Sequence, residues 1–285
     1  MNIRNYKVFP AVLHGIFHLS SLKSILRAAK IAFLEFFVHQ FAVKWKLRKD
    51  IIIHVDHPLD EKVPFTPEKV DVYLDFVAFF IRPLRMLQKR CGKNGVKRTG
   101  EFAGLVGETY KKASEFYNLF LTTTHRPKKV NYKGFGLIHA FDPHYLCVPS
   151  LHIAIVILTY SYYRKVLPEE GFSPEEQALY NSELYSGALA IAETVLYIKQ
   201  HSVNCIPAAV YMMTELVPSL FTVEDGTNFI SALFVKSNEV SQEDCKKIRE
   251  YIQDRFERLL LERQYCENWT EPLSRWLLEY HGQNS

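Results

Sequence analysis

Apolar residues three and four positions apart recur along most of this 285-residue chain, the spacing of helices that bury one face. Alternating apolar and polar residues, the pattern of strands, form no comparable series, and no internal repeat is present. The spacing predicts helices over residues 20–47, 69–88, 102–122, 150–165, 174–200, 203–221 and 242–264. We therefore expect an all-α fold, a bundle of about six or seven helices.

Four breaks divide the helical pattern. They are a proline-rich loop at 50–69 with a short strand-like piece at 51–53, a basic glycine-containing linker at 89–100, an acidic turn at 168–174 and a short break at 223–228. The expected division is 1–110 for N-terminal helices and the basic linker, 111–222 for a core, and 223–285 for a C-terminal helical extension. We expect the three parts to form one compact unit.

Composition narrows the class of protein. Apolar residues make up 48% of the chain, which is ample for a buried core and excludes a disordered protein. The five cysteines are odd in number and contain no Cys-x-x-Cys pair, so neither a zinc site nor a disulfide framework is indicated, and a reducing compartment is the simplest interpretation. The net charge of +4 is modest, and no nucleic acid partner is expected.

The segment from Asp142 to His152 carries the most chemical information. Ser150 is a good N-cap for a helix that continues through a run free of charge, and a helix start offers unpaired N–H groups to an anion. Two further segments supply cations and a second histidine: His125-Arg126-Pro127-Lys128-Lys129 and Lys199-Gln200-His201. Together the three segments contain the groups needed to move a phosphoryl group through a histidine intermediate.

Arg126-Pro127, Pro149-Ser150-Leu151-His152 and the segment from Thr194 to His201 resemble the three motifs of the type 2 phosphatidic acid phosphatase (PAP2) superfamily. The inositolphosphorylceramide-synthase-like branch is the nearer match, because Asp142 precedes the second motif and the third ends in Lys-Gln-His. The resemblance covers roughly residues 115 to 210. Three motifs in the family's order are more specific than any one of these short strings.

The resemblance implies a role for each matching residue. His201 would be the nucleophile that forms a phosphohistidine, and His152 the general acid that protonates the leaving oxygen. Arg126, Lys199 and Ser150 would bind the phosphoryl oxygens. The implied activity is that of a phosphatase or phosphotransferase acting on a small phosphomonoester or a phospholipid headgroup, with no metal or cofactor required. The site would lie between the helices 150–165 and 174–200.

The sequence also departs from the family pattern. The aspartate that orients the nucleophilic histidine is replaced by Cys205, four residues after His201. Thr194-Val195 stands in place of a Ser-Arg pair, and Leu119 in place of a lysine of the first motif. Loss of an orienting carboxylate lowers turnover by roughly 10⁴ in a serine protease triad without abolishing catalysis. Glu193 is an alternative carboxylate for the same role.

Two other functions are therefore kept open. One is a catalytically inactive PAP2-like protein that binds phospholipid or a protein partner through the same pocket. The other is a soluble helical interaction protein whose motifs match by chance. Vanadate, which resembles the phosphoryl transition state, should bind the pocket of the first two proteins and not of the third.

Membrane association is expected from the family and from one segment. Residues 20–49 combine apolar positions with a basic side that contains Lys23, Arg27, Lys30, Lys44, Lys46, Arg48 and Lys49, which suits an anionic membrane surface. A core helix with a solvated basic edge is the alternative. Residues 144–163 are long enough to span a bilayer, at about 20 residues without a formal charge. We expect an integral or surface-associated membrane protein, with a soluble cytoplasmic protein as the alternative, and the N-terminus shows no convincing signal peptide.

His54-Val55-Asp56-His57 contains residue types that bind metals. The sequence offers no third, distant ligand for them, so a solvated loop is the preferred interpretation. No metal ligands are predicted.

Overall fold

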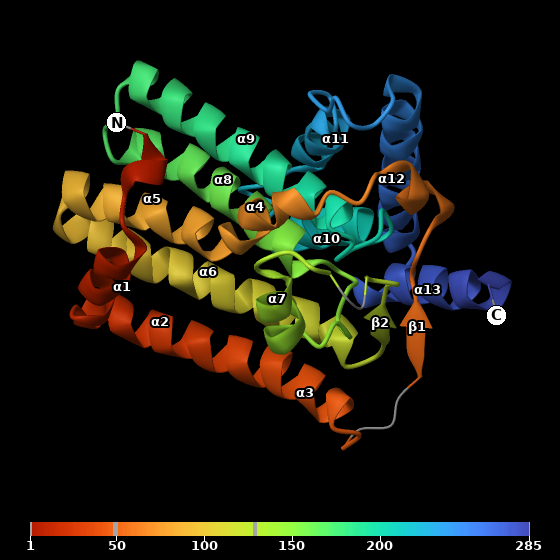
Figure 1. The fold of residues 1–285 in the computed structure, drawn as a ribbon. Coiled ribbons are helices and arrows are strands. Elements are labelled where there is room, and N and C mark those ends of the chain that lie inside the picture. The colour runs from red at the N-terminus through yellow and green to blue at the C-terminus, as the bar shows by residue number, and fades with distance from the viewer. Residues whose placement is uncertain (1, 48–50, 128–129, 285) are drawn as a thin grey trace.

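The structure is a computed structural model that describes residues 2–47, 51–127 and 130–284 (Figure 1). Arg48, Lys49, Lys128 and Lys129, which belong to the predicted basic segments, lie outside the described residues.

Most of the described chain is helical. In order, its elements are η1 (Ile3–Asn5), α1 (Val8–Ile16), α2 (Leu19–Ile31), η2 (Ala32–Val38), α3 (His39–Lys44), β1 (Ile52–His54), η3 (Pro58–Lys62), η4 (Pro67–Lys69), α4 (Val70–Leu74), α5 (Phe76–Cys91), α6 (Lys93–Tyr117), β2 (Leu121–Thr123), α7 (Phe135–Phe141), α8 (Leu151–Glu169), α9 (Pro174–Tyr197), α10 (Cys205–Leu216), α11 (Val223–Ala232), α12 (Gln242–Arg263) and α13 (Thr270–Asn284). The all-α prediction is confirmed, although the helices outnumber the six or seven expected.

Helix α8 occupies the centre of the bundle. It packs against α9, α10, α6 and α5, and nearly all of its side chains from Leu151 to Leu167 are buried (Figure 1). An apolar helix without a polar face is stable only when other helices surround it, which explains the long run without formal charge. Within the described residues, no helix has both the length and the apolar character needed to cross a bilayer.

The remaining helices form layers around α8. Helices α5, α6 and α2 follow one another on one side of it, while α9 covers another side and α11, α12 and α13 gather at the end away from α1 (Figure 1). α2 packs along much of α6, so the segment predicted to be amphipathic is part of the bundle.

Two predicted breaks are helical in the structure. The basic linker at 89–100 forms the end of α5 and the start of α6, separated only by Gly92 with a left-handed φ of 54°. The two helices meet closely there, because a Cβ on Gly95 would lie 2.1 Å from the backbone oxygen of Leu87. The break at 223–228 is the start of α11, where Thr222 and Asp225 form a capping box.

The predicted strand-like piece is part of a small sheet. β1 pairs in parallel with β2, with Ile52 opposite Leu121 and His54 opposite Thr123. The helix predicted at 102–122 ends instead at Tyr117, and the chain then enters β2. The pairing places the loop that follows β1 beside the loop that carries Arg126.

A candidate phosphoryl-transfer site at the start of α8

Ser150 caps α8, as its sequence predicts. Its backbone is extended, and its Oγ accepts the N–H of Ile153 at 3.5 Å. The carbonyl of Pro149 accepts a hydrogen bond from the Tyr117 hydroxyl at 2.5 Å. Ser150 is fully buried. The start of α8, with its unpaired N–H groups, is thus held at a fixed place in the core.

The two motif histidines meet at this helix start. Nε2 of His201 lies 3.2 Å from Oγ of Ser150 and 3.4 Å from Nδ1 of His152, and the two imidazole rings have centroids 5.5 Å apart. A nucleophile and an acid that serve one phosphorus atom must be within reach of the same substrate. The structure satisfies this requirement.

A turn at the end of α9 directs His201 into the core. Lys199 follows the helix with a left-handed φ of 55°, its N–H bonds to the carbonyl of Leu196, and the N–H of Gln200 bonds to the carbonyl of Val195. These are the two hydrogen bonds of a Schellman motif, in which glycine is the usual left-handed residue. A lysine there is strained by roughly 1–2 kcal/mol, so its side-chain contacts must offset that strain.

The contacts of Lys199 are made to a strap, which we define as residues 55–63. Nζ of Lys199 donates to the backbone carbonyls of Asp60 and Val63, at 2.5 Å each. The strap also binds residues that follow Lys199. The Asp60 carboxylate accepts the N–H of Val203 at 2.8 Å, and the carbonyl of Val55 accepts the side-chain amide of Asn204 at 3.1 Å. Lys199 therefore fixes the turn, and its ammonium group does not face the histidine pair as the family role requires.

Arg126 reaches the site indirectly. Its guanidinium donates to the side chain of Gln200 at 3.2 Å and to the carbonyl of Asp142 at 3.0 Å. The Asp142 carboxylate accepts the N–H of His144, whose ring lies 2.7 Å from Oγ1 of Thr124 and has its centroid 6.3 Å from that of His201. Neither His144 nor Gln200 was predicted as a site residue, although both lie close in the sequence to residues that were.

Burial keeps the histidines uncharged. It lowers the pKa of His152 to about 4 and that of His144 to about 3, and it lowers the pKa of His201 well below its ordinary value, with His152 and His144 adding to the effect. Burial also raises the pKa of Asp142, which Arg126 partly opposes. At neutral pH the imidazoles of the site are therefore uncharged.

His201 lacks the orienting carboxylate. Its Nδ1 is buried and has no hydrogen-bond partner among the described residues, although the backbone of Cys147 favours the charged ring. Glu193 does not replace the aspartate: its carboxylate accepts the N–H of Phe234 at 2.6 Å and is not a partner of the His201 Nδ1. Cys205 is fully buried, which raises the pKa of its thiol. The expectation that Glu193 could orient His201 is therefore wrong.

Two hollows adjoin the histidines. A cavity of about 20 Å³, roughly the space of one water molecule, is lined by Phe36, Asp142, His144, Leu146, Cys147, Leu151, His152 and His201. A cleft of about 340 Å³ continues from it, with Phe36, Asp142, Leu151 and His152 common to both. Its other lining residues are apolar or aromatic: Phe37, Tyr73, Leu74, Phe76, Val77, Tyr110, Leu137, Ile138 and Phe141.

The structure thus brings together His152, His201 and Ser150, places Arg126 at their edge and turns Lys199 away. In comparisons with known proteins, no family model, no curated protein and no solved structure matches the chain.

Proposed function

We propose that the protein transfers or hydrolyses a phosphoryl group through a phosphohistidine at His201. One observation carries the proposal: Nε2 of His201, Nδ1 of His152 and Oγ of Ser150 converge within 3.4 Å at the start of a buried helix. They supply a nucleophile, a proton donor and a hydrogen-bond donor to one position, where the helix N-terminus also favours negative charge. The PAP2-like order of the motifs assigns the same roles.

The proposed reaction has two steps. The Nε2 lone pair of His201 attacks phosphorus, the ester P–O bond breaks, and the leaving oxygen takes a proton from His152. A water or alcohol then attacks the phosphorus, the P–N bond breaks, and His152 accepts the proton of the attacking oxygen. Arg126, with Gln200, would stabilise the charge on the phosphoryl oxygens.

The uncharged state of the free site sets two conditions. His201 must be neutral to attack, which its lowered pKa ensures. His152 must carry a proton in the first step, and a phosphate dianion beside it would raise its pKa from about 4. The cavity of about 20 Å³ must also widen to admit a phosphate, and Phe36 and Leu151 are the apolar side chains that it shares with the cleft.

A lipid phosphate suits the apolar cleft better than a small polar ester does. The cleft leads to His152 and Asp142 and has room for part of a hydrocarbon chain, whose burial contributes about 0.8 kcal/mol per methylene group. The phosphate of such a lipid would lie at the histidines, and its tail along the aromatic walls.

The surface that adjoins the cleft favours an anionic membrane. The segment from α1 to Leu47 also contributes Phe36 and Phe37 to the cleft. It exposes large apolar side chains, among them Phe17 at 79% and Leu19 at 88%, and also Phe9, Leu26, Phe33, Leu34, Trp45 and Leu47. Lys23, Arg27, Lys30, Lys44 and Lys46 belong to the same segment. We infer that this face lies on acidic lipid, with the cleft beside it.

Activity measurements test the enzyme proposal. We expect His201→Ala to abolish phosphate release from p-nitrophenyl phosphate and from phosphatidic acid in vesicles, and His152→Ala to slow it by roughly 10²–10⁴. His18→Ala, which removes an exposed imidazole away from the histidine pair, is the matched control and should retain full activity on p-nitrophenyl phosphate, the soluble substrate. Undiminished activity in both site variants would overturn the proposal.

Co-sedimentation with acidic vesicles tests the membrane face. We expect the protein to bind the vesicles at low salt and salt to weaken the binding. Absence of binding at low salt would refute the membrane face.

The second candidate is an inactive relative that binds a phosphate-bearing lipid. Two observations favour it: Nδ1 of His201 has no partner among the described residues, and Lys199 is engaged by the strap. Vanadate binding that His201→Ala removes, in a protein with no turnover on either substrate, would support this function over the enzyme.

A further inference from the structure

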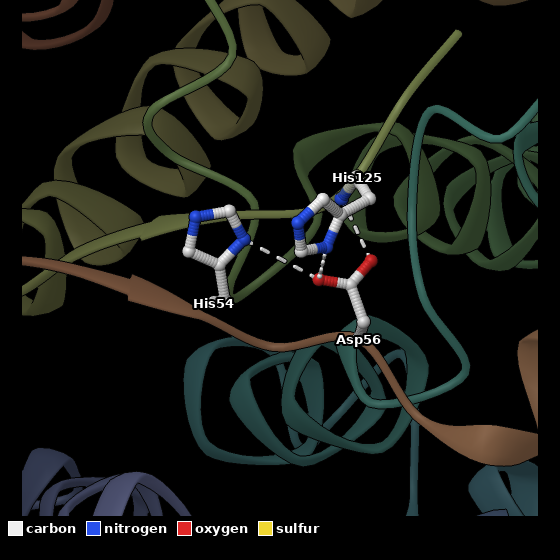
Figure 2. A group of neighbouring side chains, drawn as sticks. All are labelled: His54, Asp56 and His125. Atoms are coloured by element: carbon white, nitrogen blue, oxygen red, sulfur yellow. Dashed lines mark hydrogen bonds and ion pairs between the residues drawn. The ribbon is translucent and has the colours of Figure 1, made fainter. Parts of the chain in front are cut away.

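The structure assigns a divalent-metal site to His54, Asp56 and His125, and we propose that the metal it binds is Zn²⁺. One nitrogen or oxygen atom from each residue lies within 4.8 Å of the other two (Figure 2). The interpretation of residues 54–57 as a solvated loop without a distant ligand is therefore incomplete, because the fold supplies His125 from a segment 69 residues away.

The parallel strands explain why the three side chains meet. His54 ends β1 opposite Thr123 of β2, and the N–H of Val55 bonds to the carbonyl of Thr123 at 2.9 Å. Side chains two residues apart along a strand lie on the same face. Asp56 follows His54 by two residues and His125 follows Thr123 by two, so all three ligands project from one side of the pair.

The Asp56 carboxylate is already oriented for a metal. Its Oδ1 accepts the backbone N–H of His125 at 2.7 Å, and its Oδ2 lies 2.9 Å from Nδ1 of His125 and 3.5 Å from Nδ1 of His54. Figure 2 shows both imidazoles turned toward this oxygen. A hydrogen bond that orients a ligating carboxylate is a usual feature of metal sites.

The distances suit a small ion. Two ligands of a tetrahedral zinc ion with bonds of about 2.0–2.1 Å are separated by roughly 3.3 Å, close to the two nitrogen–oxygen distances here. The two rings stack with centroids 4.4 Å apart. Small rotations of His54 and His125 would complete the geometry, and their side chains are free to make them, being 53% and 80% exposed.

The donor set selects the class of metal. Two imidazoles and one carboxylate suit zinc and other first-row transition metals, whereas Mg²⁺ and Ca²⁺ prefer oxygen ligands. Three protein ligands leave at least one position for water or another ligand. The site is separate from the histidine pair: His125 faces Asp56, while the neighbouring Thr124 faces His144.

Metal titration of chelator-treated protein without a histidine tag tests the site. We expect one Zn²⁺ per chain by calorimetry, and d–d absorption bands when Co²⁺ is used instead. His54→Ala and His125→Ala should each weaken binding by more than about 100-fold, because even loss of an outer partner costs 10- to 100-fold. Asp56→Asn should do the same while its amide oxygen keeps the bond to the N–H of His125.

The controls make each outcome decisive. His18→Ala removes an exposed imidazole from the paired rings of His14 and His18, whose centroids are 4.8 Å apart, and should leave binding at the strand site unchanged. Failure of the wild-type protein to bind Zn²⁺ at micromolar concentrations would overturn the proposal and leave a hydrogen-bonded His–Asp–His cluster. So would binding that all three site variants retain. Circular dichroism of each variant confirms that the helices remain intact, and the binding assay is independent of any phosphatase activity.

Discussion

Acid should destabilise this protein strongly because its buried histidines are held neutral. Burial lowers the pKa of His152 to about 4 and that of His144 to about 3, against 6.5 in an unfolded chain. When the pH falls below 6.5, these histidines bind protons in the unfolded state but stay unprotonated in the folded state. The stability that these groups contribute is thus complete above pH 6.5, and it is lost between pH 6.5 and about 4 for His152 and between 6.5 and about 3 for His144.

The size of the effect follows from linkage. Within its pH window, each histidine lowers the free energy of unfolding by about 1.4 kcal/mol per pH unit. Between pH 7 and pH 5 each therefore lowers it by about 2 kcal/mol, and the two together by about 4 kcal/mol. A domain of ordinary stability has about 5–15 kcal/mol in total. Asp142 and Glu193 act in the opposite direction, because their raised pKa values let the folded state bind protons at a higher pH than the unfolded state does.

A comparison between variants isolates the histidine contribution. Urea unfolding at pH 7 and pH 5, followed by tryptophan fluorescence, gives the loss of free energy for each protein. His144→Asn should lose about 2 kcal/mol less than the wild type, since asparagine does not titrate and tolerates the left-handed φ of 70° at this position. If His144→Asn shows the full wild-type loss, the buried ring is not held neutral and the reasoning fails.

Two other substitutions give direct outcomes. Cys205→Asp should raise turnover at least about 10-fold if the missing carboxylate limits His201. Cys205 is the first residue of α10, a position that favours a negative charge. No change in kcat would show that orientation of the imidazole is not limiting. Gly95→Ala should destabilise the protein by about 1–3 kcal/mol in a urea titration, because the new Cβ would overlap the backbone of α5. Gly104→Ala, in the same helix with open space around its Cβ, is the matched control and should be neutral or stabilising; equal losses in both variants would contradict the close packing.

Local signals in the sequence predicted α8, α9, α10 and α12, but not α1, α7, α11 or α13. Ser150 is the N-cap that the sequence predicted, and Ser173 and Ser241 cap the helices predicted to begin at 174 and 242, since a cap depends only on the residues of one turn. The capping box at Thr222 is an equally local signal, and it was missed because the glycine and charges that follow resemble a loop. The linker at 89–100 was misjudged for the same reason.

Long-range contacts could not be predicted in this way. The meeting of His152 and His201 was expected only because motif order implied it, and the orientation of Lys199 was missed, since it depends on carbonyls more than 130 residues earlier in the chain. The position of His125 beside Asp56 depends on the register of two parallel strands, for which the sequence carries no local signal.

The strap of residues 55–63 has a consequence for how the site opens. It is joined to the turn that carries His201 through Lys199, Val203 and Asn204. Because these bonds link distant parts of the chain, the turn and the strap should detach together as one cooperative unit. Their backbone amides would then exchange with solvent deuterium at a common opening free energy, and any fluctuation that released the strap would also release the histidine from the start of α8.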